Sequence, residues 1–262
     1  MGMSISLFSQ TIIWNSVEFP PSLITKGALK DQGYSDKARL LMTKEIKNFT
    51  HEIHYVNSAR AINNLKTKNN YCFSGLNKNE KREKFIYFSE AFMYSLPNEI
   101  VIKKENLHRF KQFIDEKGLI DFETLLKNQN FQLVYTKERA YSKFIDKVIS
   151  KYEMNQNISY RPASDLTKGF LMMLDANRAD YIIEYPVMVG FNSTREFLSL
   201  PIKNSNTVFP VYIGCSKTAE GKEIIEEINS VIEDNKALLS DFYAQYLNEN
   251  IKKRYLNNVQ KQ

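Results

Sequence analysis

The stretch from Tyr71 to Phe92 brings together residue types that could bind an anion. An apolar run that reads as a buried strand meets Gly75, and Arg82 follows after a short polar segment. A strand that stops at a glycine exposes bare backbone for close approach by another molecule. A guanidinium can hold a carboxylate through two parallel hydrogen bonds. The stretch therefore predicts a carboxylate site, although an ordinary strand, a turn and a surface arginine would explain these residues equally well.

A second charged residue, Glu184, ends the apolar segment DYIIE and precedes Tyr185-Pro186. A single acid that works together with an arginine suits a ligand carrying both an ammonium and a carboxylate. The alternative is a strand-end acid that pairs with a nearby lysine.

Motifs of known catalytic and metal sites are missing from the sequence. It contains no nucleophile elbow, no phosphate-binding GxxxxGK segment and no HExxH motif. The histidines His51, His54 and His108 are not spaced as a set of ligands, and the two cysteines are too few for a zinc site. We therefore expect a protein that is not an enzyme and that carries no cofactor and no metal.

Length and composition describe a folded protein. The 262 residues are 43% hydrophobic and carry a net charge of +6 spread along the chain. Neither a basic block with interleaved aromatics nor a run of about 18 apolar residues occurs, so we expect no nucleic-acid partner and no membrane insertion.

The hydrophobic periodicity predicts two sets of alternating strands and helices, which is the pattern of a mostly parallel sheet covered by helices. The first set has strands at 11–14, 52–56 and 71–73 and helices at 37–49 and 58–65. The second has strands at 131–135, 158–160 and 180–184 and helices ending near 152 and 176. A returning strand at 209–215, helices at 219–234 and 237–248 and a frayed polar tail complete the chain.

These sets predict an α/β protein of two doubly wound lobes joined by two extended hinge segments. The first lobe is expected to comprise residues 1–97 and 209–262, and the second lobe residues 98–208. The hinge is expected near 96–102 and 203–210. Ligands of open α/β sheets bind beyond the carboxyl ends of the strands, where Gly75 and Glu184 both lie in this scheme.

With these elements in order, the chain resembles the extracellular solute-binding proteins of family 3, the type II periplasmic binding proteins that serve polar amino acid importers. The resemblance is carried by Gly75, Arg82 and Phe88-Ser89, by the acid-ended segment DYIIEYP and by the returning VYIGCSK. The segments CFSGL and GCSKT are more similar to a divergent branch of that family than to its well-studied amino acid binders.

The resemblance implies a role for each candidate residue. Arg82 would pair with the ligand carboxylate, Gly75 and Asn77 would supply main-chain and polar groups, and Glu184 would take the α-ammonium. The helix start from Arg139 to Ser142, which includes Tyr141, would give backbone donors to the carboxylate. Trp14 would either line the cleft or belong to the core. Asn77 stands where a hydroxyl residue is usual, and Glu184 stands where aspartate is commoner.

The implied function is a periplasmic or secreted protein whose signal peptide has been removed. It would act as a monomer that closes on a small polar zwitterion, an amino acid or related carboxylate, for the membrane permease of an ABC-type importer. Two alternatives stay open, namely a dehydratase-like enzyme for small carboxylates, with Glu184 as its acid or base, and a ligand sensor that acts on a receptor partner.

The resemblance also bears on Cys72 and Cys215. In the resembled fold the returning strand lies beside the strand that leads to Gly75, so the two cysteines could be neighbours. An even cysteine count in a secreted protein favours a disulfide, whereas two buried thiols are also common. The sequence leaves both states open.

Overall fold

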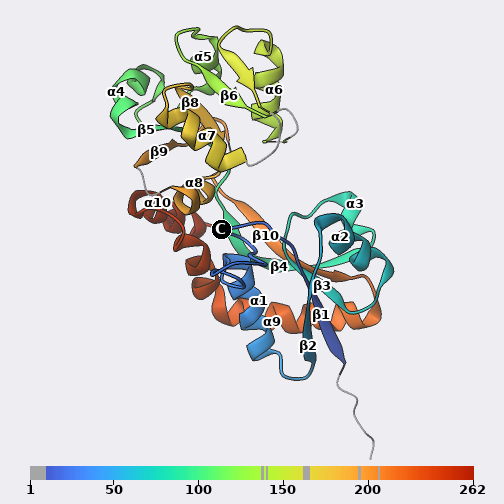
Figure 1. The fold of residues 1–262 in the computed structure, drawn as a ribbon. Coiled ribbons are helices and arrows are strands. Elements are labelled where there is room, and N and C mark those ends of the chain that lie inside the picture. Colours follow the sequence, from blue (N-terminus) through green and yellow to red (C-terminus); the bar gives the residue numbers. More distant parts are fainter. Residues whose placement is uncertain (1–9, 137–138, 140, 162–165, 194–195, 206) are drawn as a thin grey trace, which may run out of the picture. The chain divides into compact units, whose positions relative to one another are not determined.

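The computed structural model describes residues 10–136, 139, 141–161, 166–193, 196–205 and 207–262 (Figure 1). The first half contains β1 (Thr11–Ser16), α1 (Tyr34–Glu45), β2 (Thr50–Tyr55), α2 (Ser58–Thr67), β3 (Tyr71–Leu76), α3 (Glu80–Glu83), β4 (Ile86–Ser95) and β5 (Glu99–Lys103). The middle contains α4 (Leu107–Phe110), α5 (Phe122–Lys127), β6 (Leu133–Tyr135), α6 (Lys143–Tyr152), β7 (Ile158–Tyr160), α7 (Leu166–Asp175), β8 (Tyr181–Glu184), α8 (Pro186–Asn192) and β9 (Phe197–Leu200). The chain finishes with β10 (Phe209–Ser216), α9 (Ala219–Ala244) and α10 (Glu249–Val259).

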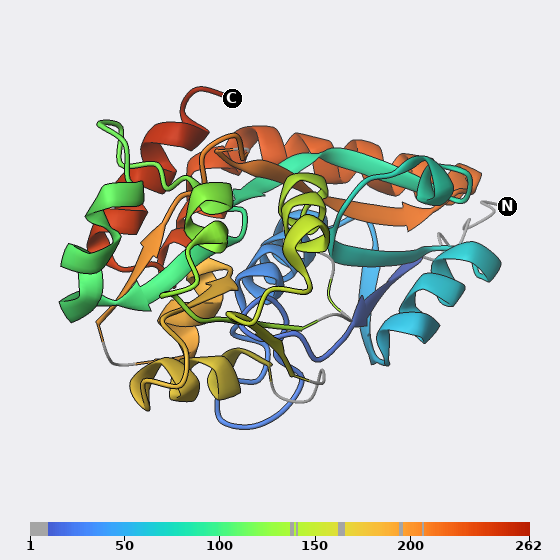
Figure 2. The ribbon, with the colours of Figure 1, turned by 90° about the horizontal axis from the view of Figure 1, so that it is seen from above.

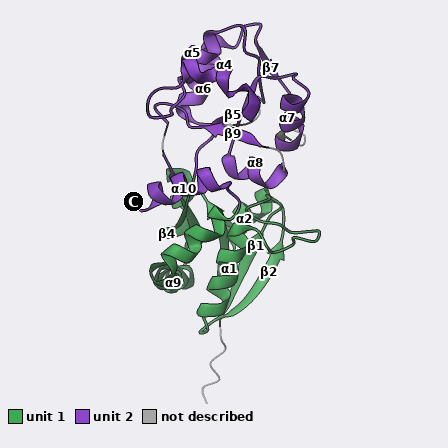
Figure 3. Cartoon of the chain, turned by 90° about the vertical axis from the view of Figure 1, so that its left-hand side faces the viewer, with its two compact units in different colours: residues 1–95, 210–245 green, residues 96–209, 246–262 purple. Residues whose placement is uncertain are grey.

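The chain divides into two compact units, each of which is discontinuous in sequence (Figure 3). Unit 1 comprises residues 1–95 and 210–245, and unit 2 comprises residues 96–209 and 246–262. The chain therefore passes between the units at 95–96, at 209–210 and again at 245–246. The first two passages fall within or next to the predicted hinge segments, whereas the third was not predicted.

The sheet of unit 1 has the strand order β2-β1-β3-β10-β4. Strands β2, β1 and β3 are parallel, as their alternation with helices predicts. Strand β10 returns antiparallel to β3 and places Cys215 opposite Cys72, and these two cysteines form a disulfide. The long helix α9 lies along β4 (Figure 2).

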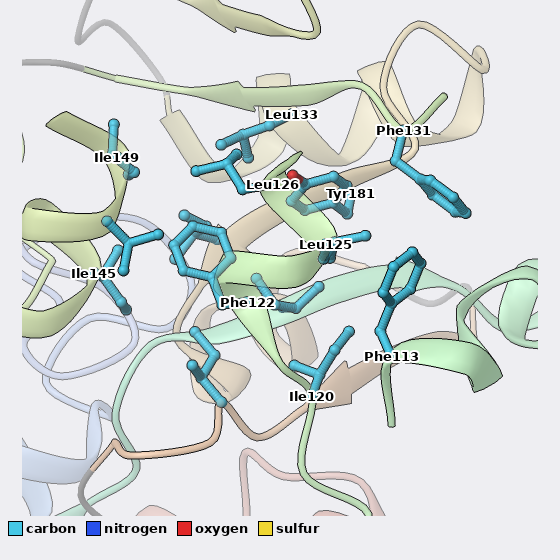
Figure 4. Close-up of a cluster of buried hydrophobic side chains, with 14 of the residues drawn as sticks. Phe113, Ile120, Phe122, Leu125, Leu126, Phe131, Leu133, Ile145, Ile149 and Tyr181 are labelled. Atoms are coloured by element: carbon cyan, nitrogen blue, oxygen red, sulfur yellow. The ribbon is translucent and has the colours of Figure 1, made fainter. Parts of the chain in front are cut away.

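The sheet of unit 2 repeats this plan with the order β7-β6-β8-β5-β9. Strands β7, β6 and β8 are parallel, and β5 runs antiparallel between β8 and β9. One face of this sheet packs on apolar side chains of α5 and α6, with Phe122 and Ile145 almost fully buried (Figure 4). These helices and strands hold the carboxyl ends of β6 and β8 at one edge.

The C-terminal segment differs from its prediction. Residues 246–262 belong to unit 2, not to the first lobe, and most of them form α10 instead of a frayed tail. The side chain of Asn248 caps the helix, and Ile251 and Tyr255 are buried. Arg254 forms two hydrogen bonds with the carboxylate of Glu99, at 2.6 and 2.8 Å. The polar composition of this segment predicted a frayed tail. The segment is ordered because it buries Ile251 and Tyr255 and because Arg254 pairs with the buried Glu99 of β5.

The first helix also begins earlier than predicted. Its N-terminal cap position is Gly33, whereas the helix was expected to begin at residue 37. The Asp36 carboxylate accepts hydrogen bonds from the backbone of Gly33 and Ile24. A side-chain carbon on Gly33 would lie 2.2 Å from the carbonyl oxygen of Ser22, so only glycine fits there. Helix α1 is therefore packed tightly against the loop that follows β1.

Candidate ligand-binding residues

Gly75 closes strand β3 in a conformation that favours glycine. Its φ angle is +90°, and an added Cβ would lie 3.3 Å from the Ser35 hydroxyl and 3.5 Å from the Ser22 hydroxyl. These two hydroxyl groups hydrogen-bond each other at 2.8 Å. The carboxyl end of β3 therefore combines an exposed glycine with two serines, which is a small polar surface in unit 1.

Arg82 lies in the short helix α3, directly after this strand end. Its Nη1 donates to the carbonyl oxygen of Asn77 at 2.7 Å, and its backbone N–H is held by the side chain of Asn79. The side chain is partly buried, and that burial lowers the pKa of the Arg82 guanidinium. Among the residues that the structure describes, no carboxylate pairs with Arg82. Gly75, Asn77 and Arg82, the three residues predicted for this half of the site, therefore lie together.

Trp14 is not available to a ligand, which corrects its expected role. The side chain is 0% exposed, and its Nε1 donates to Nδ1 of His51 at 3.1 Å. The two rings also stack. Trp14 therefore belongs to the buried core of unit 1.

Glu184 ends β8 as predicted, but its carboxylate is already fully occupied within unit 2. Its side chain is 0% exposed. Oε1 accepts from Arg139 at 2.6 Å and from the backbone of Tyr185 at 2.8 Å. Oε2 accepts from Arg139 at 2.9 Å and from the Thr167 hydroxyl at 2.8 Å. The expectation that Glu184 takes the ligand's ammonium, or acts as a catalytic acid or base, therefore does not fit this carboxylate.

Arg139 was expected only as part of the helix start that offers backbone donors, and no role was predicted for its guanidinium. Its guanidinium is held by Glu184 and by the side-chain oxygen of Asn98, at 3.1 Å. It lies between the rings of Tyr141 and Tyr185, 5.1 and 5.0 Å from their centroids, at distances typical of cation–π contacts. Burial disfavours its charge, but the bonds with Glu184 outweigh that effect and raise the pKa of Arg139.

A sequence signal for this pair did exist. Arg139 follows β6, and Glu184 ends β8, the parallel neighbour of β6. Residues just beyond the carboxyl ends of neighbouring parallel strands meet at one edge of the sheet. Opposite charges at those two positions predict an ion pair once the strand order is known.

Tyr141 and Ser142 shape the start of α6. The Tyr141 hydroxyl accepts from the backbone of Thr136 at 3.2 Å, and burial raises the pKa of this phenol. The Tyr141 backbone N–H donates to Asp146 at 3.1 Å. The Ser142 hydroxyl caps the helix by accepting from Ile145. These atoms are used within unit 2, so the predicted backbone donors at Tyr141 and the hydroxyl of Ser142 serve the fold.

Two absences hold for the residues that the structure describes. No helix there is long and apolar enough to cross a membrane. No group of three metal-ligating side chains lies together there either.

Comparisons with known proteins give the fold a name. No protein-family model matches the chain, and no curated protein sequence matches it. Among solved structures, it is similar to an ancestral cationic amino acid solute-binding protein, with a TM-score of 0.68 at 14% identity over 91% of this chain and 96% of that one. It is also similar to substrate-binding domain 2 of Lactococcus lactis GlnP in its open conformation, with a TM-score of 0.62 at 15% identity over 94% of each chain. A histidine kinase sensor domain with similarity to periplasmic binding proteins matches with a TM-score of 0.54 at 12% identity, over 95% of this chain and 96% of that one. The chain has the two-unit fold of the type II periplasmic binding proteins.

Proposed function

We propose that this protein is a solute-binding protein that captures a small polar solute carrying a carboxylate, an amino acid or related carboxylate. One observation carries the proposal beyond the fold. The guanidinium of Arg82 is partly buried at the carboxyl end of β3, and no described residue supplies a carboxylate to it. A partly desolvated cation without an opposite charge beside it is costly unless something else neutralises it. A ligand carboxylate would do so, and Gly75 beside it leaves the backbone open to close approach.

The proposed mechanism is closure of the two units on the ligand. Proteins with two domains joined by short chain passages move as hinged bodies, with a few residues absorbing the change. A ligand favours the closed state only if it gains contacts there that it lacks in the open state. The hinge is proposed at 96–102 and 203–210, and the third passage at 245–246 would have to move with it.

The proposed partner is the membrane permease of an ABC-type importer, in the periplasm or outside the cell. This choice follows the amino acid-binding proteins among the structural neighbours. A second candidate is a ligand sensor that signals through a receptor, because the same fold occurs in a histidine kinase sensor domain. Both functions need ligand capture, and co-purification with a permease or with a receptor separates them.

A thermal-shift screen against amino acids and small carboxylates tests the capture step, because a ligand that binds only the folded protein raises the melting temperature. For a ligand found this way, Arg82→Gln should weaken binding by about 2 kcal/mol or more, roughly 30-fold, because a buried charged pair is lost. Lys81→Gln is the matched control, since Lys81 is an exposed cation on the same helix. Calorimetry that shows equal affinity for wild type and Arg82→Gln would refute this role. Consumption of the ligand, followed by NMR, would instead favour an enzyme.

A further inference from the structure

We propose that unit 2 recognises the ligand through the guanidinium of Arg139 and not through an acid, so that the ligand class is a small carboxylate without an amino group. The inference rests on the proposed function, because it assumes that a solute is captured. It departs from the zwitterion that the resemblance to polar amino acid binders implies. The pair formed by Arg139 and Glu184 carries the argument.

The first step concerns the acceptor capacity of Glu184. A carboxylate offers about four lone-pair directions. The Glu184 carboxylate receives four hydrogen bonds, two from Arg139 and one each from Thr167 and the Tyr185 backbone. An ammonium group would find no free acceptor there, and it would meet an ion pair whose net charge is zero.

The second step concerns whether an incoming ammonium could displace Arg139. The arginine holds Glu184 with two parallel bonds, donates a third to Asn98 and lies between two tyrosine rings. Planar pairing through two parallel hydrogen bonds is an interaction that an ammonium cannot reproduce. The side chain of Arg139 is only 17% exposed, so leaving the pair would also uncover a buried acid. Arg139 therefore belongs to the fixed structure of this edge.

The third step concerns what Arg139 still offers. A guanidinium has five N–H donors, and the hydrogen bonds of Arg139 to Glu184 and Asn98 use one on Nη1 and two on Nη2. The Nε hydrogen and the second Nη1 hydrogen have no partner among the described residues. They lie beyond the carboxyl end of β6, the edge at which open α/β sheets bind ligands. Donors suit a carboxylate or another anionic oxygen, and they repel an ammonium.

One other acid needs consideration, because it lies after the carboxyl end of β1. Glu18 is exposed, and its Oε2 already accepts two hydrogen bonds, from the backbone and the hydroxyl of Thr25. Those bonds offset the cost of its partial burial and hold the pKa of Glu18 below its ordinary value. Glu18 is thus tied to its own loop, and it provides a control for any residual recognition of an amine.

The test compares matched ligands that differ only in the amino group, such as succinate with aspartate and glutarate with glutamate. Calorimetry on the wild-type protein should show the amine-free member of a bound pair binding at least about 10-fold more tightly. An amino acid that binds 10-fold more tightly than its amine-free partner would overturn the inference while leaving the proposed function intact, and Glu18→Gln would then show whether Glu18 is the acid involved. If no panel member binds, the proposed function and this inference both fail.

Two variants probe Arg139 directly. Arg139→Gln should weaken binding of the amine-free carboxylate at least about 10-fold and, because it frees Glu184, should raise the affinity for the aminated partner. The double variant Arg139→Gln/Glu184→Gln removes the buried charge that could prevent folding, and it should lose carboxylate binding without any gain for the amine. Lys143→Gln is the control, because it removes an exposed cation at the start of α6. Wild-type affinity for the carboxylate in both Arg139 variants would overturn the inference.

Discussion

Arg254→Gln is the substitution that most directly tests the placement of the C-terminal helix. In the wild type, Arg254 in α10 holds Glu99 of β5, whose side chain is 1% exposed, whereas that of Arg254 is 29% exposed. Removal of one partner of a buried ion pair costs about 3–5 kcal/mol, because the other charge is left uncompensated. Since Arg254 is partly exposed, we expect the lower end of that range, about 3 kcal/mol. At about 2–4 °C per kcal/mol, the melting temperature should fall by on the order of 10 °C.

The loss should depend on pH, and the sign follows from Glu99. Burial raises the pKa of this carboxyl and outweighs the bonds with Arg254, which lower it. A carboxyl whose pKa is higher in the folded than in the unfolded state binds protons more strongly when folded, so stability declines as the pH rises through the folded value. Without Arg254 the pKa of Glu99 rises further. The defect of Arg254→Gln should therefore be larger at pH 8 than at pH 5.

Thermal and denaturant unfolding at the two pH values measures this effect. Lys104→Gln is the matched control, because Lys104 pairs with Glu196 at 2.6 Å while the two side chains are 57% and 75% exposed. An exposed pair contributes about 1 kcal/mol or less, so this control should change the melting temperature little. The double variant Arg254→Gln/Glu99→Gln should recover much of the loss, because it removes the buried charge. A melting temperature of Arg254→Gln within 2 °C of the wild type at pH 8, or a defect that is equal at both pH values, would refute the reasoning.

Two further predictions concern unit 1. Cys72 and Cys215 are 143 positions apart, and reduction of their disulfide should lower the free energy of unfolding by up to ~5 kcal/mol in the chain-entropy model. If intact mass showed two alkylated thiols after denaturation without reductant, the disulfide would be absent. Gly75→Ala should lower the free energy of unfolding by about 1–2 kcal/mol because of the positive φ at this position, and by more because the added Cβ would crowd the Ser35 hydroxyl. Gly118→Ala is its control, since Gly118 has φ +76° but nothing within 4 Å of an added Cβ. Equal losses in the two glycine variants would contradict the close approach at Gly75.

The parts of the fold that could be predicted are those fixed by short-range pattern. The β-branched and aromatic residues at 11–14 and the apolar segment DYIIE alternate with amphipathic helices, and this periodicity alone indicates parallel strands. The glycine at the end of β3 was also recognisable, because a lone glycine in an apolar strand signals a special backbone position. Arg82 lies near it in the chain, so sequence proximity was sufficient to bring the two residues together.

The features that the sequence did not predict depend on contacts between residues that are distant in sequence. The sequence left Trp14 open between the cleft and the core. Its partner His51 lies on the neighbouring strand β2, and this contact together with the full burial of the indole places Trp14 in the core. The segment 249–259 is polar in composition, and the spacing of Ile251 and Tyr255 alone does not show that it packs against the rest of unit 2. Its order comes from burial of Ile251 and Tyr255 and from Glu99, about 150 positions earlier.

Glu184 shows how a local pattern can locate a residue without showing which hydrogen bonds that residue makes. The pattern located an acid at the carboxyl end of a buried strand, and the structure has it there. Whether such an acid binds a ligand depends on its acceptors, and these are filled by Arg139, Thr167 and the Tyr185 backbone. An acid with free lone pairs attracts an amine, whereas an acid that holds an arginine presents the remaining donors of that arginine instead. In the recognition that we propose, the charge that this edge offers to a solute is decided by the arginine after the neighbouring strand, and the preference between amine-free and aminated carboxylates measures it.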